Sequence, residues 1–148
     1  MILTTFEGAW SELESACFTS SFSYDDPHTP FSQVVDDHFR TTSQAELHGV
    51  YLIRKKHPSR EVLRVGKAGS VTRGGLYKAQ DIPGRLKNVK GDVPANQYFS
   101  QLLLEEGPLL IQYVCLPPKP MSASLVEATL LQAYLNERGS LPPRNSEL

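Results

Sequence analysis

Residues 49–68 read GVYLIRKKHPSREVLRVGKA, and the order of apolar and turn-forming residues within them predicts a β-hairpin. Apolar and β-branched side chains dominate residues 50–54 and again 62–66, a composition typical of strands. Between these two runs lies the sequence His-Pro-Ser at residues 57–59, which has the chemistry of a hairpin loop.

A loop and then a helix are predicted downstream of this hairpin. Residues 67–80 contain repeated glycines and show no clear period, which indicates a loop. Asp81 can cap a helix that includes Pro83, because proline is tolerated in a first helical turn. That helix would carry Arg85 and Val89.

Three further elements complete the predicted core. Pro94 opens a second helix, residues 109–116 form a β-branched and aromatic strand, and Ser122 caps a long helix that Gly139 closes. The order β-β-α-α-β-α predicts an α/β fold, in which helices flank a small three-stranded sheet, mixed or antiparallel, as a sandwich.

Residues 1–47 are interpreted as an extension that packs on a core domain of residues 48–148. Short helices are predicted over 8–18 and 31–39, whereas residues 19–30, rich in Ser, Asp and Pro, predict turns and loop. The extension is too aromatic to be a plain disordered tail.

Length and composition are those of one soluble domain. The 148 residues, 40% of them hydrophobic, can bury a core without metal or disulfide staples. Cys17 and Cys115 lie too far apart in the sequence to form a zinc cluster. There is no apolar run of about 18–20 residues and no basic start before an apolar run, so we expect no membrane span, no secretory signal and a cytoplasmic setting.

The net charge of −1 conceals a strong partition along the chain. Residues 1–50 carry eight acids and one base, whereas residues 51–90 carry eleven bases and two acids. A surface that meets phosphates would need such a concentration of cations, which points to a nucleic acid. Alternatively, the acids and bases are separated along the chain only because this favours solubility.

Several short motifs, in order, resemble the GIY-YIG nuclease domain family over residues 48–146. They are Gly49-Val50-Tyr51, Arg64-Val65-Gly66-Lys67-Ala68, Arg85 on the next helix, Glu127 in the last long helix, and Asn145 after two prolines. The chain departs from the family pattern at two positions. Arg64 stands where a tyrosine is usual, and Val89 stands where a histidine or tyrosine is usual.

This resemblance implies a metal-dependent endonuclease that hydrolyses phosphodiester bonds of DNA, preferably double-stranded, in restriction or repair. Glu127 would hold one divalent ion, Mg²⁺ or Mn²⁺. Tyr51 would lie near the attacking water and Arg85 on the phosphate. A homodimer is one expected assembly, and no membrane is involved.

The chemistry of the individual residues agrees with these roles. A hairpin turning at residues 56–59 would place Tyr51 opposite Arg64, whose guanidinium would lower the pKa of the tyrosine and make it a proton acceptor. Alternatively, Tyr51 is a half-buried strand residue with an arginine stacked on its ring. Arg85 has a fork suited to phosphate, near a helix N-terminus that also attracts phosphate, or else it is a plain surface arginine.

Glu127 is flanked by apolar residues on its helix, so its carboxylate requires a cation or hydrogen-bond donors. A magnesium ion, which keeps several waters, can be held by one carboxylate. The alternative is a glutamate at the rim of the core.

Four further residues are candidates for phosphate or DNA contact. Gly66 would permit close approach of backbone or substrate, Lys67 and Lys87 would supply point charges, and Asn145 would anchor the tail near the site or stand there incidentally. The histidines His28, His38, His48 and His57 lack metal-ligand spacing.

The alternative to an enzyme is a catalytically silent nucleic-acid-binding module that retains the fold.

Overall fold

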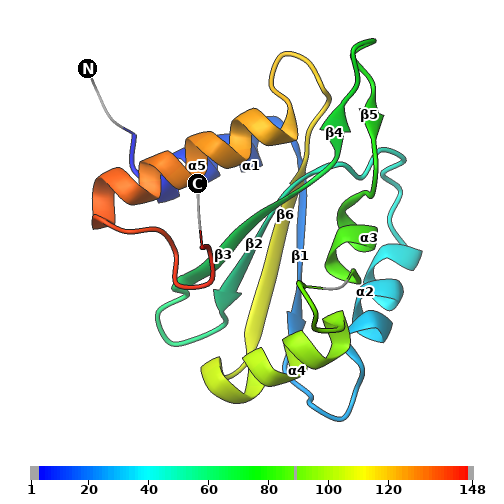
Figure 1. Ribbon diagram of the computed structural model, residues 1–148, viewed down its shortest axis with the longest axis vertical. Helices are drawn as coiled ribbons and strands as arrows, with labels where there is room; N and C mark the ends of the chain where they lie inside the picture. The colour runs from blue at the N-terminus through cyan, green and yellow to red at the C-terminus, as the bar shows by residue number, and fades with distance from the viewer. Residues whose placement is uncertain (1–3, 89, 147–148) are drawn as a thin grey trace.

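The computed structural model describes residues 4–88 and 90–146, which form an α/β structure around an antiparallel sheet (Figure 1). The four strands of that sheet lie in the order β1 (Phe18–Tyr24), β6 (Leu109–Cys115), β2 (Gly49–Lys55) and β3 (Val62–Ala68). All neighbouring pairs are antiparallel. The coarse α/β class and the antiparallel option are therefore confirmed, and the sheet has one strand more than expected.

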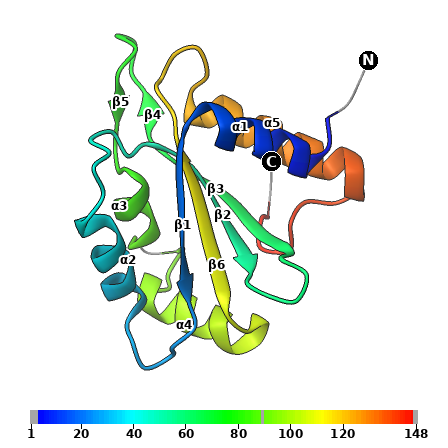
Figure 2. The ribbon, with the colours of Figure 1, turned by 180° about the vertical axis from the view of Figure 1, so that it is seen from behind.

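Helices cover both faces of the sheet (Figures 1 and 2). On one face lie α1 (Phe6–Ala16) and α5 (Ala123–Arg138), and on the other lie α2 (Phe31–Arg40), α3 (Ile82–Leu86) and α4 (Ala95–Glu106). Because successive side chains of a strand point to opposite faces, Tyr51 and Ile53 enter the core under α2, α3 and α4. Val50 and Leu52 enter the core under α1 and α5.

The additional strand β1 corrects the prediction of turns and loop for residues 19–30. It pairs with β6 along its whole length, from Phe18 opposite Cys115 to Tyr24 opposite Leu109. Phe18, Phe22 and Tyr24 alternate with polar residues, which is the pattern of a strand with one face on the core. The serines among residues 20–23 favoured a loop in the sequence analysis, so the alternating pattern of the strand was missed.

The capping residues predicted from the sequence mark the ends of α3 and α5. The side chain of Asp81 accepts a hydrogen bond from the Gly84 N–H at the start of α3, and Ser122 caps α5 in the same manner. Gly139 ends α5 in the left-handed conformation, with φ of 77°. Val89, expected on the same helix as Arg85, lies outside the described residues, and α3 ends at Leu86.

One connection differs from expectation. The segment 67–80 continues β3 to Ala68 and then forms a small ribbon of β4 (Ser70–Val71) and β5 (Tyr77–Lys78).

Over residues 4–88 and 90–146, no helix combines the length and the apolar character that a bilayer crossing requires.

The register of the β2–β3 hairpin also differs from the predicted one. Tyr51 pairs with Gly66, and Arg64 pairs with Ile53. The ladder carries a bulge between Ile53 and Arg54, so the connecting loop is longer than a turn at 56–59. Tyr51 and Arg64 therefore share a face of the sheet as diagonal neighbours and not as a direct pair.

Candidate functional site

The candidate site lies around β3, which contacts both α3 and α5 (Figure 1). Tyr51 enters it from β2, and its ring lies over Gly66 of the neighbouring strand. A Cβ atom on Gly66 would lie inside van der Waals contact with the ring carbons and hydroxyl of Tyr51. Gly66 thus makes room for the tyrosine ring, a more specific role than close approach of substrate.

Tyr51 does not have the lowered pKa that was expected. Its side chain is fully buried, and burial raises the pKa of its hydroxyl. The charge of Arg64, a hydrogen bond from that guanidinium and the charge of Arg85 act in the opposite direction, but they are weaker than burial. The correction follows from the depth of β2 in the sheet, which the sequence pattern did not reveal.

Arg64 bridges the site and the C-terminal segment. One terminal nitrogen donates a hydrogen bond to the Arg144 carbonyl at 3.1 Å. Its Nε is buried and has no hydrogen-bond partner among the described residues. An unsatisfied buried donor is uncommon in native proteins and is often found where function imposes the arrangement.

Glu127, on α5, lies within range of the charges of Lys67, Arg64 and Arg85. Burial raises the pKa of its carboxyl, whereas the charges of Lys67, Arg64 and Arg85 lower it. Lys67 also donates a 2.7 Å hydrogen bond to Ser124, one turn before Glu127 on the same helix. The predicted residues Tyr51, Arg64, Lys67, Arg85 and Glu127 are therefore close enough to influence one another, although they come from four different elements.

The chemistry of a metal site here would rest on Glu127. No group of three or more His, Cys, Asp or Glu is found within residues 4–88 and 90–146. A hard ion that keeps most of its waters can use one carboxylate, so the residues present fit Mg²⁺ in that mode.

Arg85 is exposed on α3, where its side chain is the feature suited to phosphate. The helix has five residues, and Asp81 already occupies its N-terminus, so the expected attraction of phosphate by the helix end is not supported. Lys90 is partly buried and donates a 2.6 Å hydrogen bond to the Arg85 carbonyl. Burial, together with Arg85 and Arg64, lowers the pKa of Lys90 to about 8.

The side chain of Asn145 is bonded to the backbone of β3. Its side-chain oxygen accepts from the Val65 N–H, and its amide donates to the Val65 carbonyl, both at 2.9 Å. Together with the Arg144 N–H, which bonds to the Leu63 carbonyl, it covers the open edge of β3. The expected anchoring of the tail is thus confirmed.

Part of the charge partition of the sequence is compensated by ion pairs inside the molecule. Acids of the first 50 residues pair with bases of residues 51–90: Glu7 with Arg54 at 2.7 Å, Asp25 with Lys56 at 3.1 Å, and Asp36 with Lys87 at 2.6 Å. Lys87 is therefore held in an ion pair with Asp36 in this structure. Among the described residues, the site cations Arg64, Lys67, Arg85 and Lys90 form no ion pair with a carboxylate, so positive charge remains unpaired at the site.

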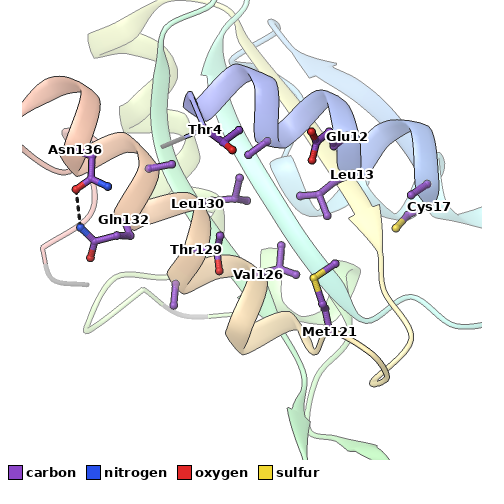
Figure 3. Close-up of a pocket in the computed structure, with 14 residues that line it drawn as sticks. Thr4, Glu12, Leu13, Cys17, Met121, Val126, Thr129, Leu130, Gln132 and Asn136 are labelled. Atoms are coloured by element: carbon purple, nitrogen blue, oxygen red, sulfur yellow. Dashed lines mark hydrogen bonds between the residues drawn. The ribbon is translucent and has the colours of Figure 1, made fainter. Parts of the chain in front are cut away.

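An apolar groove lies elsewhere on the surface, between α1 and α5 (Figure 3). Its volume is about 640 Å³, and Leu13, Val126 and Leu130 contribute to its wall. None of the predicted site residues lines it. The groove and the cationic site are separate features.

Comparison with protein-family models, with curated proteins and with solved structures finds no match to this chain.

Proposed function

We propose that this protein is a divalent-metal-dependent DNA endonuclease with a fold of the GIY-YIG type. The observation that carries the proposal is the convergence of Tyr51, Arg64, Arg85 and Glu127 from separate elements. The charges of the two arginines act on the pKa of both Tyr51 and Glu127. Perturbed titratable groups that cluster with cations are typical of catalytic sites.

Each side chain has a role that its environment supports. Arg85 is exposed and would bind the scissile phosphate through its guanidinium fork. Arg64 hydrogen-bonds Tyr51 and would hold it in position as the acceptor of the proton of the attacking water. Lys67, tied to Ser124, would add positive charge beside the phosphate.

Glu127 would hold the metal ion, Mg²⁺ or Mn²⁺. When bound, the ion would supply Lewis acidity to the phosphate and to the attacking water. The charges of Lys67, Arg64 and Arg85 lower the pKa of Glu127 and so offset part of the effect of burial, which suits a metal ligand.

The second candidate is a catalytically silent DNA-binding module. It is favoured by one specific observation: Tyr51 is only 1% exposed, and burial raises the pKa of its hydroxyl, which limits its use as a proton acceptor. Arg64 in the place of the usual second tyrosine points the same way.

A plasmid-nicking assay separates the two candidates. The parent protein should convert supercoiled plasmid to open circles in Mg²⁺ and not in EDTA. Glu127→Gln, which keeps the side-chain volume and removes the charge, should abolish nicking and leave DNA affinity within about a few-fold of the parent. Glu137→Gln, on an exposed position of the same helix, is the matched control and should nick as the parent does. DNA binding without nicking in any metal would establish the silent module.

A further inference from the structure

The β4–β5 ribbon projects from the sheet between β3 and α3 (Figures 1 and 2). Ser70 pairs with Lys78, and Val71 pairs with Tyr77. Its tip is built around Thr72, whose N–H bonds to the Leu76 carbonyl at 2.8 Å and whose carbonyl accepts from Gly75 at 2.9 Å. The Thr72 hydroxyl accepts a third bond, from the Leu76 N–H. The ribbon is therefore a shaped projection and not a loose loop.

One face of the ribbon is fixed to the body of the protein. The Tyr77 ring stacks on His48 with centroids 4.8 Å apart, and its hydroxyl accepts a hydrogen bond from the Ala123 N–H at the start of α5. Because side chains alternate across a strand, Leu76 and Lys78 point away from that anchored face. Leu76 is 69% exposed, so its side chain is available for contact with a ligand.

Positive charge surrounds this exposed leucine. Arg73 is exposed at the tip, Lys78 is exposed on the strand, and the side chain of Lys119 lies beside Gly75. None of these three cations has an ion pair with a carboxylate in the part of the chain that the structure describes. A surface that combines an apolar residue with unpaired cations complements a polyanion that also offers apolar groups. The groove of a nucleic-acid duplex has both properties.

The position of the ribbon in the chain relates it to the candidate site. It begins directly after β3, which carries Lys67, and leads into α3, which carries Arg85. A duplex whose backbone lay on those two cations would extend past the ribbon. The major groove, about 12 Å wide, admits a two-stranded β-ribbon.

We propose that the β4–β5 ribbon enters the major groove of duplex DNA beside the candidate site and reads its sequence. Arg73 would contact the edge of a guanine, Leu76 the methyl group of a thymine, and Lys78 and Lys119 the flanking phosphates. This inference rests on the proposed function, since it requires DNA as the ligand.

The test measures binding of a labelled 20-base-pair duplex of mixed sequence by fluorescence anisotropy in EDTA, so that cleavage plays no part. Arg73→Ala and Leu76→Ala should each weaken binding by about 5- to 100-fold, the range of a base contact. Arg138→Ala removes the same charge at the far end of α5 and should leave affinity unchanged. Thermal unfolding of each variant checks that the fold is intact.

Groove ligands complete the design. Methyl green, which occupies the major groove, should compete with the protein, and netropsin, which occupies the minor groove, should not. Competition by netropsin alone, ribbon variants that bind as the parent does, or a parent that binds no duplex would each overturn the ribbon assignment. Nicking by a protein whose ribbon variants bind normally would overturn this inference and leave the proposed nuclease intact. Ribbon-dependent binding without nicking in any metal would support the ribbon assignment and overturn the proposed nuclease.

Discussion

Gly66 lies directly opposite Tyr51 in the β2–β3 pair, and the tyrosine ring fills the space that a side chain at residue 66 would need. The glycine of one predicted motif is therefore the packing partner of the tyrosine of the other. This relationship explains why the two motifs occur together in one hairpin.

Gly66→Ala should destabilise the protein and displace Tyr51. The added methyl would collide with the ring of a residue that is buried on every side, and overpacking of this kind costs about 1–3 kcal/mol. Urea denaturation measures the loss. In the background of Tyr51→Val, which removes the ring, the same substitution should cost clearly less. An equal cost in both backgrounds would show that the ring is not what Gly66 accommodates.

Tyr51→Phe should slow cleavage by about 10²- to 10⁴-fold with little change in DNA affinity, if the hydroxyl accepts the proton. Tyr98→Phe on α4 is the control and should cleave at the parent rate.

The pH–rate profile tests the part played by Arg64. Because burial raises the pKa of Tyr51, the phenolate is the minor form at neutral pH, and the cleavage rate should rise as the pH rises. Arg64→Tyr removes a cation that favours the phenolate, so the pKa of Tyr51 rises further and the rising limb should move to higher pH. An unmoved limb would separate Arg64 from the ionisation of Tyr51.

Asn145→Ala should lower the free energy of unfolding by about 1–3 kcal/mol, because the N–H and carbonyl of Val65 both lose their partner at the edge of β3. Asn136→Ala, in an exposed pair with Gln132 on α5, should change stability far less. Denaturant melts of the two variants give the comparison. A loss of cleavage at unchanged stability would instead assign Asn145 to the chemistry.

Asp36→Asn should strengthen DNA binding, since it releases Lys87 from its ion pair. If the freed lysine reaches a phosphate, the slope of log affinity against log salt should steepen by about 0.9. Asp37→Asn removes the same charge from the partner of Arg40 and is the control. Equal effects of the two substitutions would indicate a general change in net charge and no contact by Lys87.

The sequence predicted elements with local signals and missed relations that depend on distant residues. Asp81, Ser122 and Gly139 mark helix ends by chemistry confined to one turn, and these ends were correct. The register of Tyr51 and Arg64 was wrong, because it depends on a bulge beside Ile53.

The same limit applies to the candidate site. The motif order identified residues that the structure brings together, but the burial of Tyr51 depends on the whole sheet and the helices above it. The contact of Asn145 with Val65 spans 80 positions in the sequence. Lys90 was overlooked because its hydrogen bond is to the backbone of Arg85, a contact that no spacing rule indicates.

Strand β1 has a further consequence for the molecule as a whole. It covers β6 from Leu109 to Cys115, a strand whose residues are nearly all buried. Without β1, that strand would present a long apolar edge with free backbone donors and acceptors, the kind of edge that recruits strands from other chains. By pairing with β6 along its whole length, β1 removes that edge from the surface and turns the outer side of the sheet into a strand rich in serine.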